Sequence, residues 1–224
     1  MNPNVPTARF PIRLHRYGHA AVLFASLITP ISAQEPTTPV ADAPVYQVGD
    51  TWTFSTVKAN GDPGDTTVQT VMAVSGNQTR IDASKNGEPP YEVDLNNQGD
   101  MFRSGDTTWE PSIGWLSFPM RVGKSWSFHD LKRTHSAIAD IAEDVKVVAF
   151  ERVLVRAGAF DAYKIVIRGV YAKHLGGGLA VQIHSTYWYA PSVKAIVKFE
   201  TGWTNYHNGN SETTVEMTAF SLAQ

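Results

Sequence analysis

The sequence patterns that mark the commonest catalytic and metal sites are missing from this chain. There is no cysteine, which excludes a thiolate nucleophile and a cysteine-based metal centre. Neither the G-x-S-x-G turn of serine hydrolases nor the H-E-x-x-H zinc motif occurs. No two histidines beyond residue 33 are two or four positions apart; they are His129, His135, His174, His184 and His207. We therefore expect no catalytic residues of a recognisable type, no metal and no cofactor.

The residues best suited to bind a ligand are Tyr163, Tyr187, Ser185, Glu151 and Phe199. Hydroxyl groups beside aromatic rings can orient a molecule that is otherwise apolar. A carboxylate on the same apolar surface must be paired, hydrogen-bonded or protonated. Whether these residues meet depends on the strands that carry them.

The sequence predicts strands almost throughout. Short runs rich in Val, Ile, Thr and aromatic residues, such as Thr66–Val74, Gln78–Asp82 and Tyr91–Leu95, are separated by Gly, Asn and Pro. The best helical candidate is the short stretch Ala137–Glu143. We expect a mainly β protein with a curved antiparallel sheet and little helix.

One motif occurs twice, as VGDTWTF at Val48–Phe54 and as VGKSWSF at Val122–Phe128. A turn glycine followed by alternating large apolar residues starts a strand with Trp and Phe on one face. Large aromatic residues mostly fill cores. The motif therefore predicts two related strand starts, with four structural core residues: Trp52, Phe54, Trp126 and Phe128.

Four strands with three turns organise the C-terminal half: Val145–Val155, Asp161–Tyr171, Leu179–Tyr189 and Ala195–Trp203. We predict that Val153 pairs with Tyr163, Tyr163 with Tyr187, and Tyr187 with Val197. This register gathers one apolar face: Val145, Val147, Ala149, Val153, Tyr163, Ile165, Ile167, Ile183, Tyr187, Val197 and Phe199. The opposite face is polar: Lys146, Arg152, Lys164, Arg168, Gln182, His184, Lys198 and Glu200.

The same register places Glu151 and Ser185 on the apolar face, beside Ile165. Two interpretations stay open for Glu151. It marks a polar point in a ligand cavity, or a β-bulge near Val148 turns Phe150 inward and Glu151 outward. The bulge is favoured, because Phe150 otherwise lies on the polar face.

Residues 1–33 have the layout of a secretory signal. Basic residues precede the apolar run Ala20–Thr29, and small residues stand before Gln34. About a dozen apolar residues are too few to span a membrane as a helix. We expect cleavage after Ala33, a Pro-rich linker over residues 34–44, and a single β-rich domain over residues 45–224.

Charge and cysteine content limit the cellular compartments and the partners that are possible for this protein. Without the three arginines of the signal, 16 basic and 21 acidic residues remain, so we expect no nucleic-acid partner. Gln34, rather than a lipid-bearing Cys, follows the expected cleavage site. The sequence thus predicts a soluble periplasmic or secreted bacterial protein that is not a lipoprotein and has no transmembrane anchor after processing.

Two stretches resemble a known family. Glu151–Ile165 (ERVLVRAGAFDAYKI) resembles its E-x-V-x-V-P-A-G-T-F-x-A-Y-K-I stretch, and Thr186–Val193 (TYWYAPSV) its T-x-W-Y-A-P-x-V-G stretch. The family is the DUF3108-like (TapB-type) group of uncharacterised bacterial envelope proteins. The resemblance implies a fold related to the LolA/LolB half-barrel and an envelope location, with no reaction. Arg156 replaces a family Pro and Lys194 a family Gly, so these two turns are expected to differ in shape.

These observations favour a non-enzymatic binding protein that holds an apolar ligand, such as a lipid or acyl chain, on the concave face of the sheet. The first alternative is an interaction or scaffold module of the envelope, with an envelope protein as partner and no ligand cavity. The second is a hydrolase with a convergent Asp/Glu/His/Ser site. A cavity of several hundred Å3 distinguishes the first hypothesis from the scaffold.

Overall fold

The computed structural model describes residues 39–58, 60–174, 179–205 and 209–224. The expected signal, its cleavage site and the first part of the Pro-rich linker lie outside these residues, as does His207. Among the residues described, no helix is long and apolar enough to cross a membrane.

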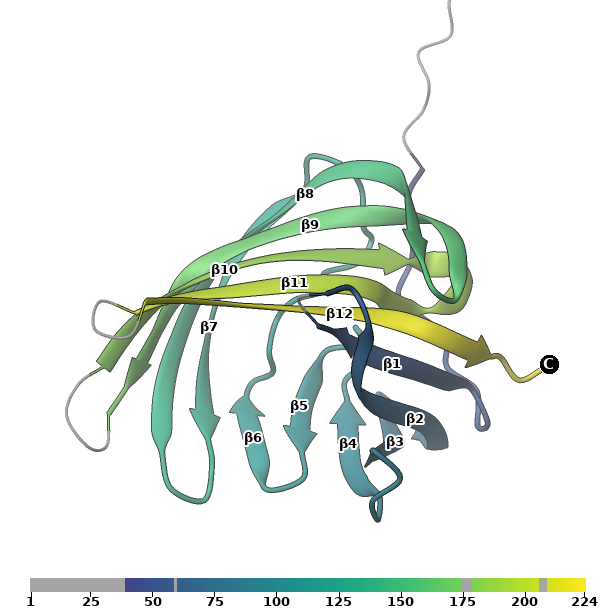
Figure 1. Ribbon diagram of the computed structural model, residues 1–224, viewed down its shortest axis with the longest axis horizontal. Coiled ribbons are helices and arrows are strands. Elements are labelled where there is room, and N and C mark those ends of the chain that lie inside the picture. The colour runs from purple at the N-terminus through teal and green to yellow at the C-terminus, as the bar shows by residue number, and fades with distance from the viewer. Residues whose placement is uncertain (1–38, 59, 175–178, 206–208) are drawn as a thin grey trace, which may run out of the picture. The chain divides into compact units, whose positions relative to one another are not determined.

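Twelve antiparallel strands form a sheet that closes on itself (Figure 1). The strands are β1 (Thr51–Val57), β2 (Pro63–Ser75), β3 (Gln78–Lys85), β4 (Tyr91–Leu95), β5 (Met101–Ser104), β6 (Thr107–Glu110), β7 (Ser125–Arg133), β8 (Ile138–Val155), β9 (Gly158–Lys173), β10 (Leu179–Ala190), β11 (Ala195–Asn205) and β12 (Gly209–Ser221). The one helical element described is a 3-10 turn, η1 (Pro191–Val193). The prediction of a mainly β, antiparallel fold is confirmed. The sheet curves further than the expected half-barrel, because β1 pairs with β12 from Thr51↔Ser221 to Val57↔Thr214.

The two ends of the barrel differ. The turns that follow β3, β5 and β7 lie at one end, which we call the turn end. At the other end lies the long segment between β6 and β7, whose residues Ile113, Leu116 and Met120 are buried. The N-terminal segment joins it there, because Ala41 forms an isolated antiparallel bridge with Met120. Access to the interior is therefore expected from the turn end.

Ala137–Glu143, the best helical candidate in the sequence, is not a helix, since these residues lead into and form the start of β8. Ala139, Ile141 and Glu143 are buried, whereas the intervening Ala142 is exposed. This alternation has the period of a strand, and β8 is paired on both edges, with β7 and with β9. Tertiary pairing therefore decides the conformation of a stretch whose own preference is weak.

The predicted pairing of Val153 with Tyr163 is also wrong. Val153 pairs with Phe160, and Tyr163 pairs with Phe150. The hairpin closes through residues 156–157 alone, so the turn is shorter than predicted and the register moves by three residues. An odd shift reverses faces. Val153 consequently packs in a different core cluster from Tyr163.

The next two predicted pairings are shifted by two residues. Tyr163 pairs with Tyr189, and Tyr187 pairs with Phe199. An even shift keeps side chains on the same face, so Tyr163 and Tyr187 still share one apolar cluster. Val197 is the exception: the register shift beside it makes it an extra residue, and it packs in the other cluster.

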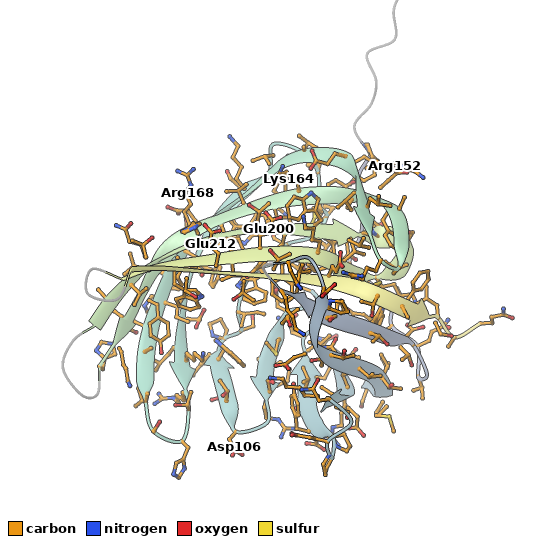
Figure 2. All side chains as sticks on the ribbon, viewed as in Figure 1. Asp106, Arg152, Lys164, Arg168, Glu200 and Glu212 are labelled. Carbon is orange, nitrogen blue, oxygen red and sulfur yellow. The ribbon has the colours of Figure 1, made fainter. Side chains whose placement is uncertain are left out.

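The β-bulge predicted near Val148 is confirmed. The register of β8 against β9 shifts between Val147 and Ala149. Phe150 turns toward the core, where its ring lies 4.7 Å from that of Tyr163. Ala149, expected on the apolar face, instead pairs with Lys164, whose charged side chain points away from the barrel in Figure 2.

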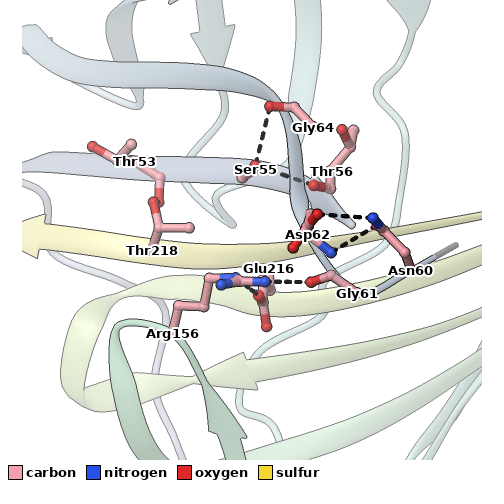
Figure 3. Close-up of polar contacts among 10 residues, drawn as sticks. All are labelled: Thr53, Ser55, Thr56, Asn60, Gly61, Asp62, Gly64, Arg156, Glu216 and Thr218. Atoms are coloured by element: carbon pink, nitrogen blue, oxygen red, sulfur yellow. Dashed lines mark hydrogen bonds and ion pairs between the residues drawn. The ribbon is translucent and has the colours of Figure 1, made fainter. Parts of the chain in front are cut away.

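Beyond the bulge, the tip of the β8–β9 hairpin folds against β12. The Ala157 N–H donates to the Met217 carbonyl at 3.0 Å, and the Phe160 and Phe220 rings lie 5.7 Å apart. Arg156 donates to the Glu216 carboxylate at 2.6 Å and also to the Gly61 carbonyl of the β1–β2 turn (Figure 3). Arg156 thus ties the hairpin tip to the barrel wall.

Both copies of the repeated motif make the same turn. Gly49 and Gly123 have φ values of 95° and 87°, which only glycine adopts readily. The Gly49 N–H donates to the Val71 carbonyl at 2.9 Å, and the Gly123 N–H donates to Val147 at 2.8 Å. Each turn therefore starts the first strand of a six-strand half, β1–β6 or β7–β12.

Candidate functional site

The interior of the barrel holds two adjoining cavities. The first, of about 440 Å3, lies against β1–β5, and the second, of about 360 Å3, lies against β6–β10. Both reach β11 and β12. Four side chains line both: Ile113, Trp115, Tyr187 and Phe199. We call them the apolar cavity and the acidic cavity, for the residues described below.

An aromatic group stands where the two cavities meet. The Trp115 ring lies 4.8 Å from that of Tyr187, edge to face, and the Phe199 ring lies 5.7 Å from that of Tyr187. Trp115 comes from the segment between β6 and β7, whereas Tyr187 and Phe199 come from neighbouring strands. These three rings are the boundary between the two spaces.

The apolar cavity is walled mainly by hydrophobic side chains, including Trp52, Ile81, Val93, Leu95 and Met101. At the turn end its lining is charged, because Asp65 and Lys85 form an ion pair of 2.9 Å there beside the exposed Tyr91. This cavity therefore combines an apolar interior with a charged mouth, which suits the uptake of an apolar chain.

The acidic cavity contains two buried carboxyl groups, Asp130 on β7 and Glu143 on β8. Their exposed fractions are 2% and 7%. Burial raises the pKa of Asp130 to about 7. Burial, followed by repulsion from Asp130, raises the pKa of Glu143 to about 7, with Trp115 opposing. The two carboxyl groups are thus balanced between neutral and charged forms near neutral pH.

Lys132 lines the same cavity, two residues after Asp130 on the inward face of β7. Its Nζ lies 5.5 Å from the centre of the Trp109 ring and 5.9 Å from that of Tyr171. Burial lowers the pKa of Lys132, and Asp130 opposes this effect. The ammonium group is therefore held by aromatic faces beside the carboxyl groups.

Hydroxyl groups complete the polar side of the acidic cavity. Ser185 Oγ lies 3.4 Å from Thr201 Oγ1, and both residues line the cavity. Burial raises the pKa of Tyr187 well above its usual range, so its phenol remains neutral. These groups can both donate and accept hydrogen bonds.

Of the five predicted ligand-binding residues, the structure brings three together: Tyr187, Ser185 and Phe199 all line the acidic cavity. Tyr163 lies elsewhere, because its hydroxyl donates to the Pro39 carbonyl at 2.6 Å. Glu151 lies outside the barrel interior, accepting a hydrogen bond of 2.9 Å from the Trp188 indole. The bulge at Val148 is the physical reason for the outward position of Glu151.

The four aromatic residues predicted for the core are buried to different extents, and Trp52 and Phe54 also line the apolar cavity. The Trp52 indole donates to the Val193 carbonyl at 2.8 Å, and the Trp126 indole donates to Gly114 at 2.9 Å. Trp52 is 2% exposed. Trp126 is half-buried, as are Phe54 and Phe128. The two indoles therefore anchor different covering segments in the same way.

Sequence reasoning missed Asp130 and Glu143, although a signal for both was present. Strand alternation from Trp126 and Phe128 places Asp130 on the same inward face. Glu143 follows Ala139 and Ile141 at the same period, but that stretch was interpreted as helical. The structure also explains how Glu143 fits: it pairs with Gly169, where a Cβ atom would lie 2.5 Å from Glu143 Cγ.

The fold and the interior cavities define a closed antiparallel barrel, and two solved structures resemble it. One is a protein of Bacteroides fragilis, described as exported and as having a YmcC-like fold, with TM-score 0.50, 16% identity, and coverage of 82% of this chain and 100% of that one. The other, described as a lipoprotein, is from Parabacteroides distasonis, with TM-score 0.52, 13% identity, and coverage of 81% and 99%. No protein-family model and no curated protein sequence matches the chain. At these identities the similarity establishes a fold of the YmcC-like kind.

Proposed function

We propose that this chain is an exported, non-enzymatic binding protein that holds an apolar ligand, a lipid or acyl chain, inside the barrel. The apolar cavity carries the proposal. Its volume of about 440 Å3 falls within the range of ligand pockets, and aromatic and aliphatic side chains form most of its wall.

Two further observations support the location. The sequence has the layout of an export signal, and the two similar structures are described as an exported protein and as a lipoprotein. Membership of the DUF3108-like family, suggested by the motifs at Glu151–Ile165 and Thr186–Val193, is part of the same proposal. The absence of cysteine favours a soluble periplasmic form over a lipid-anchored one.

Native mass spectrometry of the protein purified from its own periplasm tests the proposal. We expect a co-purified lipid or acyl compound, released on denaturation. Val93→Phe fills the apolar cavity and should abolish this mass, whereas Val68→Phe, on an exposed position of β2, should retain it. A wild-type protein free of any bound mass would favour the scaffold alternative.

A hydrolase is the second candidate, because Asp130 and Glu143 share one cavity and both have a pKa near 7. General acid–base catalysis uses carboxyl groups with pKa values near the working pH. Turnover of ester or glycoside substrates that is lost in both Asp130→Asn and Glu143→Gln would favour this candidate over simple binding.

A further inference from the structure

Two carboxyl oxygens in the acidic cavity have no hydrogen-bonding partner among the described residues. They are Asp130 Oδ1 and Glu143 Oε2, on side chains more than nine-tenths buried. A buried polar atom without a partner is unfavourable, so a ligand that donates hydrogen bonds to these oxygens gains affinity from them. When the two carboxyl groups are ionised, these oxygens accept hydrogen bonds, so the cavity favours a ligand that donates hydrogen bonds or carries a positive charge.

Aromatic rings line a large part of this cavity. Trp109, Trp115, Tyr171 and Trp203 all contribute, and the Tyr171 and Trp203 rings lie 5.9 Å apart, edge to face. Aromatic faces attract ammonium groups, most strongly where water is excluded. Lys132 shows that an ammonium group fits here, because its Nζ already lies over the rings of Trp109 and Tyr171.

We propose that the acidic cavity binds the organic ammonium group of an amphiphile, with Asp130 and Glu143 as its counter-charges. The apolar part of the same molecule passes the aromatic boundary at Trp115 and lies in the apolar cavity. This inference rests on the proposed function and adds the chemical class of the ligand. An anionic headgroup is disfavoured, because it would face two carboxyl groups.

Lys132 is the competitor for this site. Its ammonium group occupies the aromatic faces that the ligand's ammonium group would use, and it lies beside Asp130 on the same strand face. Binding therefore moves Lys132 aside, toward the turn end where β7 ends at Arg133. Removing the Lys132 charge should strengthen binding of a cationic ligand rather than weaken it.

Isothermal titration calorimetry with three ten-carbon probes, each below its micelle concentration, tests the inference. The probes are decylammonium, decyl sulfate and 1-decanol, at pH 8 and low salt. We expect decylammonium, whose N–H groups can donate to the two carboxylates, to bind at least tenfold more tightly than the other two. Asp130→Asn and Glu143→Gln should each weaken its binding at least fivefold and leave decanol binding unchanged.

Asp144→Asn is the matched control, because Asp144 neighbours Glu143 on β8 but is exposed and faces outward. It should leave all three affinities unchanged. Lys132→Met is an independent measurement that does not depend on folding of the carboxyl variants, and it should bind decylammonium several-fold more tightly than wild type.

The outcomes separate the two proposals. Equal binding of all three probes, unchanged in Asp130→Asn and Glu143→Gln, would overturn the ammonium site while leaving an apolar ligand in place. A preference for decyl sulfate, or weaker ammonium binding in Lys132→Met, would also overturn it. Failure of every probe to bind, together with no co-purified ligand, would overturn the proposed function itself.

Discussion

At the scale of single residues, Asp130 and Glu143 couple the stability of the barrel to pH. Their ordinary pKa values are near 4, and in the folded protein burial raises each pKa to about 7. Between these values the folded state binds more protons than the unfolded state, so the free energy of unfolding falls as pH rises. We expect a loss of about 1–3 kcal/mol per carboxyl group from pH 4.5 to pH 8, since a tenfold change in proton affinity is worth about 1.4 kcal/mol.

Urea unfolding between pH 4.5 and pH 8 measures the slope of the free energy of unfolding against pH. Asp130→Asn and Glu143→Gln should each flatten it, because the amide cannot ionise. Burial also raises the pKa of Asp100 to about 7, so part of the pH dependence remains in both variants. Asp144→Asn should keep the wild-type slope. A slope unchanged in both cavity variants would contradict the assignment of the raised pKa values.

The ion pair of Asp50 with Lys194 gives a second prediction at this scale. Burial alone would raise the pKa of Asp50, but hydrogen bonds from Lys194 at 2.8 Å and from the Gln47 and Ala223 N–H groups more than offset it. The pKa of Asp50 therefore lies below its usual range. Lys194→Met leaves a buried charge without its counter-ion and should cost about 3–5 kcal/mol of unfolding free energy. We expect the Asp50→Asn, Lys194→Met double variant to regain part of this lost free energy of unfolding, measured by urea unfolding. If the losses of the two single variants simply add in the double variant, the pairing is contradicted.

At the scale of elements, the two tryptophans of the repeated motif predict unequal losses. Trp52 is 2% exposed, so Trp52→Ala should cost about 3–5 kcal/mol, the usual loss for a core aromatic residue. Trp126 is half-buried, and Trp126→Ala should cost less. Chemical unfolding of both single variants, with Trp109→Ala as a comparison from the cavity wall, measures the difference. Melting of both variants within a degree or two of wild type would contradict a structural role for the motif.

The features that were predicted correctly from the sequence are the local ones. Alternation and turn residues predicted the antiparallel strands, the repeated strand starts and the bulge at Val148, because each depends on a few neighbouring residues. The register of Val153 and Tyr163 was wrong, because it depends on the length of the turn at 156–157 and on packing of the hairpin tip against β12. Barrel closure depends on pairing between β1 and β12, which no local pattern specifies.

The candidate site was predicted only in part for the same reason. Tyr187, Ser185 and Phe199 were found because adjacent strands place them on one face. Asp130 and Glu143 were missed because no register was predicted for β7 against β8, so nothing placed these carboxyl groups beside Tyr187 and Phe199. The acidic cavity is lined by seven successive strands, β6 to β12, and its residues meet only once the curvature of that sheet is known.

At the scale of the whole molecule, the two six-strand halves contribute unlike walls to one interior. The half that begins at Trp52 provides most of the apolar cavity, and the half that begins at Trp126 provides both carboxyl groups of the acidic cavity. The closed sheet brings these walls together, and Trp115 stands between them. The barrel is therefore suited to a ligand with two chemically different ends.

Trp115 forms part of the boundary between the apolar and the acidic cavity. Trp115→Leu keeps an apolar side chain but removes the indole between Tyr187 and the segment that covers the barrel. The two cavities should then merge further, and the binding preference should move toward longer chains. Tetradecylammonium should gain at least fivefold in affinity relative to decylammonium, measured by calorimetry below their micelle concentrations. Trp109→Leu is the control, because Trp109 lines the acidic cavity alone and should leave this ratio unchanged. A folded Trp115→Leu variant that keeps the wild-type ratio of the two affinities would contradict one ligand bound across Trp115. A ligand that occupies both cavities passes this ring, so removing the ring has to change the chain length that binds best.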